Sequence, residues 1–283
     1  MNLDQFIQDL RASRGFMEQV THWEVLPARP ARMADFPPAL DARLPAMLRA
    51  RGVMGLYVHQ RQAIDALCAG RHIVVVTPTA SGKTFCYNLP VLDAILKNED
   101  TRALYLFPTK ALAADQASEL YEWIQAMGVD IKAYTYDGDT PGTARRAIRQ
   151  AGHVVVTNPD MLHANILPAH TKWVKLFENL RYIVIDEIHA YRGVFGSNLA
   201  NVIRRLKRIC AFYGSHPQFI CCSATIANPD ELAQAITGEK VQMIDENGAP
   251  SGERHVVFYN PPVVNRQLGI RRSVLSETRT IAS

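Results

Sequence analysis

Short apolar runs alternate with amphipathic stretches from about Arg51 onward. The β-rich apolar runs lie at residues 73–76, 103–107, 131–135, 153–157, 181–185 and 218–222. Between them, apolar residues recur at helical spacing, most clearly after Lys83 and from Leu112 to Met127. Strands that alternate with helices lie parallel, and uniformly apolar strands are buried on both faces. The pattern therefore predicts an α/β fold, a mostly parallel sheet with helices on both faces.

The two ends of the chain have a different pattern. Prolines interrupt any long helix before residue 50, at Pro27, Pro30, Pro37, Pro38 and Pro45. Residues 1–50 are therefore expected to form an extended N-terminal arm, and residues 51–258 a single lobe. The sequence FYNPP at residues 258–262 is typical of a linker, so residues 259–283 are expected to leave the lobe.

Composition excludes several classes of protein. A chain of 283 residues that is 48% hydrophobic and 20% charged has enough apolar material for a globular core, so it is neither a miniprotein nor a disordered chain. The formal net charge of +4 neither indicates nor excludes a nucleic-acid partner. Binding depends on how basic side chains cluster, and a total says nothing about clusters.

Membrane, secretory and zinc-binding features are not expected. The apolar runs are far shorter than the roughly 20 residues that span a bilayer, and the N-terminus lacks the pattern of a secretory signal. No membrane partner and a cytoplasmic location are therefore expected. No two of the five cysteines have the C-x-x-C spacing, so they are interpreted as reduced thiols that fill the core.

A loop of small residues connects the strand at 73–76 to the helix that follows. Its residues are Thr77, Pro78, Thr79, Ala80, Ser81, Gly82, Lys83 and Thr84. In such a unit, backbone amides and the helix dipole cradle phosphates, Lys83 reaches the β and γ phosphates of ATP, and the Thr84 hydroxyl binds Mg²⁺. The strict motif has glycine in place of Thr77, and Gly-Lys-Thr also occurs at helix starts without chemistry. The strand and helix around it favour an ATP-binding loop.

A second candidate is an apolar strand that ends in two carboxylates. Residues 182–185 are followed by Asp186, Glu187, Ile188 and His189. Ligands of open parallel sheets bind beyond the carboxyl ends of the strands, which places these side chains beside the phosphate loop. Asp186 is expected to hold Mg²⁺, and Glu187 to accept a proton from the water that attacks the γ-phosphorus. The alternative, an acidic pair that caps the next helix, is disfavoured by the phosphate loop.

With these residues the chain resembles the superfamily 2 helicases of the DEAD/DEAH-like type, in particular their first RecA-like lobe. The motifs of that family follow in order from Gln60 to the Ser-Ala-Thr sequence at residues 223–225. The resemblance implies that Gln60 recognises the adenine edge of ATP, with Tyr57 beside it. It also implies that His189, Ser223 and Thr225 couple the state of ATP to strand binding.

The resemblance also implies that three loops contact a nucleic-acid backbone. Their candidate residues are Pro108, Thr109 and Lys110, then Gly138 and Asp139, then Thr157, Asn158 and Asp160. Each loop follows a predicted strand, so its amides and hydroxyls are expected at the same sheet edge as the phosphate loop. Such groups hold phosphates without reading bases, which predicts binding of single strands independent of sequence. Without the resemblance, each loop would be an ordinary strand-to-helix turn.

A closer resemblance is to the bacterial mitomycin repair factor A family and its fungal RecQ4-like relatives. It rests on residues 86–90, 189–197 and 259–262. These relatives are DNA helicases that move 3′ to 5′ on single strands, so the resemblance implies an ATP-dependent DNA helicase of DNA repair. In that family a second RecA-like lobe supplies arginines to the transferring phosphoryl group. Residues 259–283 would then be the interlobe linker and the start of a missing second lobe, and this chain alone would hydrolyse ATP very slowly.

Two alternatives remain open from the residues. An RNA helicase lobe would carry the same motifs, because contacts to the 2′-hydroxyl cannot be recognised in one sequence. A non-catalytic nucleic-acid-binding fragment is the other alternative. A small-molecule kinase on the same phosphate loop is disfavoured, because it has no need for the residues at 186–189 and 223–225.

Overall fold

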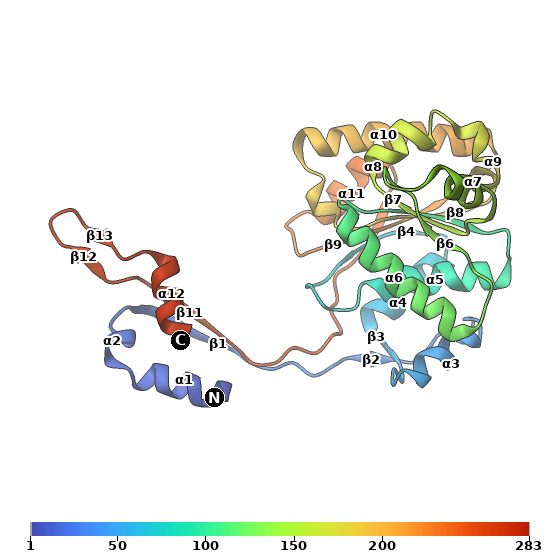
Figure 1. Ribbon diagram of the computed structural model, residues 1–283. Helices are drawn as coiled ribbons and strands as arrows, with labels where there is room; N and C mark the ends of the chain where they lie inside the picture. Colours follow the sequence, from blue (N-terminus) through green and yellow to red (C-terminus); the bar gives the residue numbers. More distant parts are fainter. Residues whose placement is uncertain (1, 283) are drawn as a thin grey trace. The chain divides into compact units, whose positions relative to one another are not determined.

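The computed structural model describes residues 2–282 (Figure 1). Contacts divide the chain into two compact units, one of residues 31–249 and one of residues 1–30 with 250–283. No helix of the described residues is long and apolar enough to cross a membrane.

The unit of residues 31–249 is built on a seven-stranded parallel sheet with the order β10-β4-β9-β8-β5-β7-β6. Its strands are β4 (His72–Val76), β5 (Arg102–Leu106), β6 (Ala133–Thr135), β7 (Val154–Thr157), β8 (Leu180–Ile185), β9 (Gln218–Ser223) and β10 (Val241–Ile244). The six predicted strands are confirmed. The edge strand β10 was not predicted, because its run of four residues is short and is interrupted by the polar Gln242.

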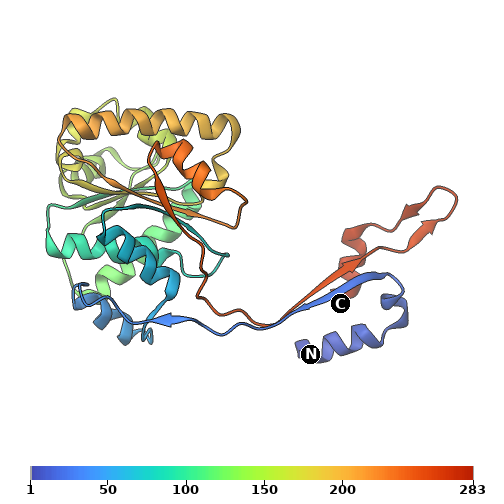
Figure 2. The ribbon, with the colours of Figure 1, turned by 180° about the vertical axis from the view of Figure 1, so that it is seen from behind.

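Helices cover both faces of this sheet, as Figures 1 and 2 show. One face carries α3 (Arg43–Ala50), α4 (Val58–Cys68), α5 (Thr84–Lys97) and α6 (Lys110–Met127). The other carries α7 (Gly142–Ala151), α8 (Pro159–Met161), the short π-helix η1 (Leu162–Ile166), α9 (Val174–Glu178), α10 (Gly193–Phe212) and α11 (Pro229–Thr237). Alternate residues of β4 point to opposite faces of the sheet. Ile73 and Val75 pack in the core under α3 to α6, and Val74 and Val76 pack in the core under α7 to α11. The predicted α/β fold is confirmed.

Two short strands and two 3₁₀ helices complete this unit. The strands β2 (Met33–Ala34) and β3 (Leu56–Tyr57) pair antiparallel, and the 3₁₀ helices η2 (His170–Lys172) and η3 (Ile188–Ala190) follow α8–η1 and β8.

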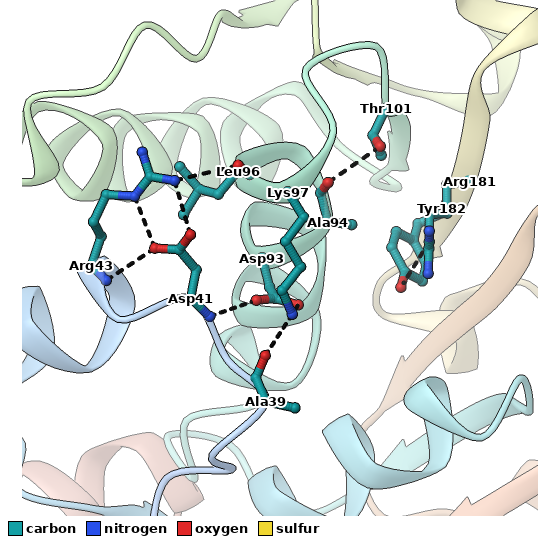
Figure 3. Close-up of polar contacts among 10 residues, drawn as sticks. All are labelled: Ala39, Asp41, Arg43, Asp93, Ala94, Leu96, Lys97, Thr101, Arg181 and Tyr182. Atoms are coloured by element: carbon teal, nitrogen blue, oxygen red, sulfur yellow. Dashed lines mark hydrogen bonds and ion pairs between the residues drawn. The ribbon is translucent and has the colours of Figure 1, made fainter.

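Hydrogen bonds connect residues 39–43 to the C-terminal half of α5 (Figure 3). The Asp41 amide donates to Asp93 Oδ1 at 2.8 Å, and Arg43 Nε donates to Asp41 Oδ1 at 2.8 Å. The Lys97 ammonium binds Asp93 Oδ2 at 2.7 Å and also the Ala39 carbonyl. The Arg43 hydrogen bonds lower the pKa of Asp41 to about 2. These contacts attach the second half of the expected arm to the sheet unit.

The other unit joins segments from the two ends of the chain. It contains α1 (Leu3–Ala12), α2 (Arg14–Met17), β1 (Val20–Leu26), β11 (Arg254–Tyr259), β12 (Val263–Asn265), β13 (Ile270–Arg271) and α12 (Val274–Ala282). β1 pairs antiparallel with β11, and Trp23 Nε1 donates to His255 Nδ1 at 3.0 Å. Phe16 stacks on Tyr259, whose hydroxyl donates to Glu277 at 2.9 Å.

The observed division therefore falls at other positions than the expected ranges 1–50, 51–258 and 259–283. β1 and β11 are far apart in sequence, and the pattern of residues near each strand does not indicate that the two pair. Residues 31–50 and 250–258 consequently change units with respect to the expectation.

Gly196 in the first turn of α10 allows a test of the packing there. A Cβ at this position would lie 2.4 Å from the Tyr191 carbonyl oxygen, so backbone must shift. Gly196→Ala should lower the free energy of unfolding by about 1–3 kcal/mol, measured by denaturant unfolding. Gly142→Ala at the start of α7 is the control, because nothing lies within 4 Å of its Cβ. Equal stability of the Gly196→Ala and unsubstituted proteins would contradict this account.

Candidate ATP and nucleic-acid site

The sheet order brings three predicted motifs to one edge. Strand β9 lies between β4 and β8, and all three are parallel. The loop at 77–83, the acidic pair after β8 and the Ser-Ala-Thr sequence at the end of β9 therefore emerge side by side at the carboxyl ends of the strands.

The phosphate loop is tightly curled. The hydroxyls of Thr77 and Ser81 lie 2.6 Å apart and are buried. Ala80 and Gly82 have φ angles of 62° and 78°, in the left-handed region. The Lys83 ammonium donates to the carbonyls of Thr77 at 2.8 Å and Pro78 at 3.0 Å, so it lies over its own loop.

Gln60 connects α4 to this loop. Its Oε1 accepts from the Tyr57 amide and its Nε2 donates to the Gly82 carbonyl, each at 2.9 Å. A Cβ on residue 82 would lie 2.6 Å from that Nε2, which adds a steric reason for glycine to its positive φ. The Tyr57 ring stacks on His59 beside the loop. The structure thus brings Gln60 into contact with the phosphate loop, and the Tyr57 amide is held by the same Gln60 side chain.

Asp186 and Glu187 lie directly after β8 in different environments. The Asp186 side chain is half-buried, desolvation raises its pKa to about 6, and its Oδ1 accepts from the Glu187 amide at 2.8 Å. Glu187 has a φ of 50°, an uncommon left-handed conformation for a residue other than glycine. The two carboxylates have different partners, since Asp186 contacts the Glu187 amide and the Tyr87 hydroxyl while Glu187 contacts His189.

His189 links Glu187 to the end of β9. Its Nδ1 lies 3.1 Å from Glu187 Oε2 and 3.2 Å from the Ala224 amide, which donates to it. A protonated Nδ1 binds the carboxylate and an unprotonated one accepts from the amide, so the two contacts belong to different tautomers. Ser223 is buried, with a hydroxyl that has no hydrogen-bond partner among the described residues, whereas Thr225 is exposed. His189 therefore contacts the Ser-Ala-Thr sequence through the Ala224 backbone amide. The Thr225 side chain has no hydrogen bond to His189 in the described residues.

The predicted nucleic-acid loops follow β5, β6 and β7 at the same sheet edge. Lys110 Nζ binds Asp139 Oδ2 at 2.6 Å, and Gly138 lies beside that ammonium. The hydroxyl of Thr109 and the side-chain oxygen of Asn158 cap α6 and α8. Pro108 is half-buried and Asp160 is exposed. The three loops are thus adjacent at this edge.

The hydroxyl of Thr157 differs from the expectation. It is 1% exposed and donates to the Tyr136 carbonyl at 2.6 Å, because it closes the connection between β7 and the loop after β6. This hydroxyl therefore faces the protein and not a bound strand.

Two polar residues at the site were not predicted as functional. Tyr87 donates to Gln116 Oε1 at 2.7 Å, with Asp186 Oδ2 at 3.3 Å, and Thr84 Oγ1 also donates to Gln116 Oε1 at 3.3 Å. Gln116 lies in the helical stretch predicted from Leu112 to Met127 and Tyr87 in the family segment 86–90, and neither side chain was assigned a role from the sequence. The signal in the sequence was the polar Gln116 on the face of the predicted helix that packs against the sheet, where a polar side chain needs a hydrogen-bond partner.

The side chains at this edge suit a magnesium nucleotide. Thr84 offers a hydroxyl and Asp186 a half-buried carboxylate, which are the hard oxygen ligands that Mg²⁺ prefers. Hydrogen bonds through Gln116 and Tyr87 link the two groups, and Thr84 directly follows Lys83 of the phosphate loop. The residues present therefore fit the metal and the nucleotide.

Residues 57–232 match the DEAD/DEAH box helicase family. The chain belongs to this family. The matched range begins at the Tyr57 beside the phosphate loop and ends in α11, so it contains every predicted motif of the sheet edge.

Three relatives of this helicase family are similar over nearly the whole chain. The uncharacterized ATP-dependent helicase YprA of Bacillus subtilis is 59% identical and is aligned with 99% of the chain, which spans 37% of its length. The ATP-dependent helicase HRQ1 of Saccharomyces cerevisiae is 37% identical, and the chain spans 27% of its length. A crystal structure of the DUF1998 helicase MrfA bound to DNA is 58% identical, with a TM-score of 0.95 over 100% of this chain and 37% of that one. The fold is the RecA-like fold of helicases, and the chain spans about a third of its relatives' length.

Proposed function

We propose that this chain is the ATP-binding first lobe of an ATP-dependent DNA helicase that moves 3′ to 5′ on single-stranded DNA, in DNA repair. The observation that carries the proposal is the convergence of Lys83, Thr84, Asp186 and Glu187 at one sheet edge, beside the loops after β5, β6 and β7. The similarity to MrfA, whose structures were solved with DNA and with DNA and AMPPNP, supports DNA as the strand.

In this proposal each group of the phosphate loop has one task. Lys83 leaves the loop carbonyls to bind the β and γ phosphates, while the amides of residues 79–84 surround them. Thr84 and Asp186 hold Mg²⁺, which neutralises phosphate charge. Glu187 accepts the proton of the attacking water, and Gln60 and Tyr57 contact the adenine.

Strand binding uses the backbone and small side chains of the three loops. Pro108, Thr109 and Lys110, Gly138 and Asp139, and the loop of Asn158 and Asp160 present amides and polar groups at one edge, which suits phosphates better than bases. His189, Ser223 and Thr225 couple the state of the nucleotide to this edge. Because Lys110 pairs with Asp139, a DNA phosphate would compete with a carboxylate for the lysine.

A second RecA-like lobe is part of the proposal as a partner in the same protein. Residues 259–283 would lead to it, and closing of the cleft by ATP would move the lobes along the strand. The proposed location of the protein is the cytoplasm, where it would meet its DNA substrate. An RNA helicase lobe and a non-catalytic nucleic-acid-binding fragment stay as alternatives that the next experiment separates.

An unwinding assay tests the proposal. A two-lobe protein that includes this chain should separate a DNA duplex with a 3′ single-stranded overhang, in the presence of ATP and Mg²⁺. Lys83→Ala should abolish both nucleotide binding and unwinding, because it removes the charge that holds the phosphates. Unwinding from a 5′ DNA overhang would contradict the direction, efficient unwinding of RNA would favour the RNA alternative, and no unwinding at all would favour the non-catalytic one.

A further inference from the structure

Two uncharged side chains connect the candidate metal ligands. Thr84 is the first residue of α5, and Asp186 follows β8. The two side chains come from different elements, so the backbone alone does not determine how the Thr84 hydroxyl and the Asp186 carboxylate are oriented. Gln116 of α6 and Tyr87 of α5 form a chain of hydrogen bonds between them, from Thr84 Oγ1 to Gln116 Oε1, then to the Tyr87 hydroxyl and Asp186 Oδ2, at 3.3, 2.7 and 3.3 Å.

The Gln116 carbonyl determines how the Thr84 hydroxyl is oriented. A hydroxyl that binds a cation must point its oxygen lone pairs at the metal and its hydrogen elsewhere. Gln116 Oε1 accepts that hydrogen, and its second lone pair accepts the hydrogen of Tyr87. The amide oxygen is therefore fully used by the two hydroxyls, and the lone pairs of Thr84 stay available.

Tyr87 restrains the carboxylate on the other side. Its side chain is fully buried, and its ring packs edge-on against Tyr105, so the position of the hydroxyl is set by the core. The single hydrogen of the hydroxyl points at Gln116 and partly at Asp186 Oδ2. The other carboxylate oxygen accepts from the Glu187 amide, so both oxygens of Asp186 have a fixed partner. Neither Tyr87 nor Gln116 adds charge to the site.

We infer that Tyr87 and Gln116 are positioning residues that orient Thr84 and Asp186 for the Mg²⁺ of bound ATP. The inference rests on the proposed function and deepens it, because it assigns residues that act through the metal ligands without touching the nucleotide. Partners of this kind typically change metal affinity by 10–100-fold when they are removed.

The test measures how Mg²⁺ strengthens the binding of a fluorescent ATP analogue to the 283-residue chain. Tyr87→Phe removes one hydroxyl and keeps the ring in the core. It should weaken the Mg²⁺ dependence of binding about 10-fold and leave binding in EDTA unchanged. Tyr105→Phe is the matched control, because its hydroxyl donates to Asn88 at 2.9 Å in the same core without contacting a ligand of the metal. It should lose stability in thermal unfolding and keep the unsubstituted Mg²⁺ dependence.

The outcomes separate this inference from the proposed function. If the unsubstituted chain binds the analogue equally with and without Mg²⁺, the proposed function fails, and the inference with it. If only the inference is wrong, Tyr87→Phe and Tyr105→Phe have the same Mg²⁺ dependence as the unsubstituted chain.

A double-mutant cycle tests whether Gln116 acts through Thr84. Gln116→Leu should weaken the Mg²⁺ dependence in the unsubstituted chain and have no further effect when Thr84→Ala is already present. Additive effects of the two substitutions would overturn the assignment of Gln116, because they would mean that it acts on the metal site by another route.

Discussion

The 283-residue chain by itself should hydrolyse ATP about 10³–10⁵-fold more slowly than a protein in which a second RecA-like lobe completes the site. The cause is charge. Lys83 is the cation of the phosphate loop, and no arginine of residues 2–282 forms a hydrogen bond or ion pair with residues 77–84. An arginine from a second lobe would stabilise the negative charge that builds up on the transferring phosphoryl group.

A steady-state ATPase assay with saturating single-stranded DNA measures this difference. The same assay is made on a two-lobe protein that includes the chain and on that protein with the arginines of its second lobe replaced by alanine. The alanine variant should fall to the rate of the isolated chain. Robust turnover by the isolated chain would mean that the described lobe carries a complete hydrolytic site, and the proposal of a shared site would be wrong.

The sheet and its functional edge could be predicted because both depend on local signals. Each buried strand is a short apolar run, and the loop after β4 and the carboxylates after β8 are contiguous sequences. In a parallel sheet these loops must meet at one edge, so identifying the strands was enough to predict that Lys83 and Asp186 come together. The family resemblance added the roles of residues, which neither periodicity nor spacing supplies.

Long-range pairing could not be predicted in the same way. β1 and β11 are both half-exposed ribbons near the ends of the chain, and their pairing depends on contacts such as that between Trp23 and His255. Prolines correctly indicated that no long helix forms before residue 50, but they do not say where an extended segment packs. The attachment of Asp41 to Asp93 is likewise a contact between segments that share no pattern.

Side-chain orientation at the site was also outside the reach of the sequence. A threonine after a strand was expected to present its hydroxyl, yet the hydroxyl of Thr157 satisfies a buried carbonyl instead. Gln116 lies in the predicted helical stretch from Leu112 to Met127, and the helical period does not show which partner a polar side chain there has. Its partners, Thr84 and Tyr87, lie on a different helix, so only the packing of α5 against α6 reveals them.

Glu187→Gln in a two-lobe protein should keep nucleotide binding and lower the rate of ATP turnover by about 10²–10⁴-fold. The amide has the shape of the carboxylate and the same backbone, including the left-handed φ of 50°, so the fold of the turn is preserved. It has no free carboxylate to accept a proton from water. The His189 ring keeps its contacts in this variant, since its Nδ1 lies 3.1 Å from the side chain at residue 187 and 3.2 Å from the Ala224 amide.

The measurement combines binding of a fluorescent ATP analogue with single-turnover hydrolysis. Glu122→Gln on α6 is the matched control, because this exposed carboxylate pairs with Arg51 and, among residues 2–282, forms no hydrogen bond or ion pair with the loops of the site. Both variants should bind the analogue like the unsubstituted protein, and only Glu187→Gln should lose the chemical step. Normal hydrolysis by Glu187→Gln would show that the proton goes elsewhere. Asp186 would then be the next carboxylate to test, since it is adjacent to Glu187 at the end of β8.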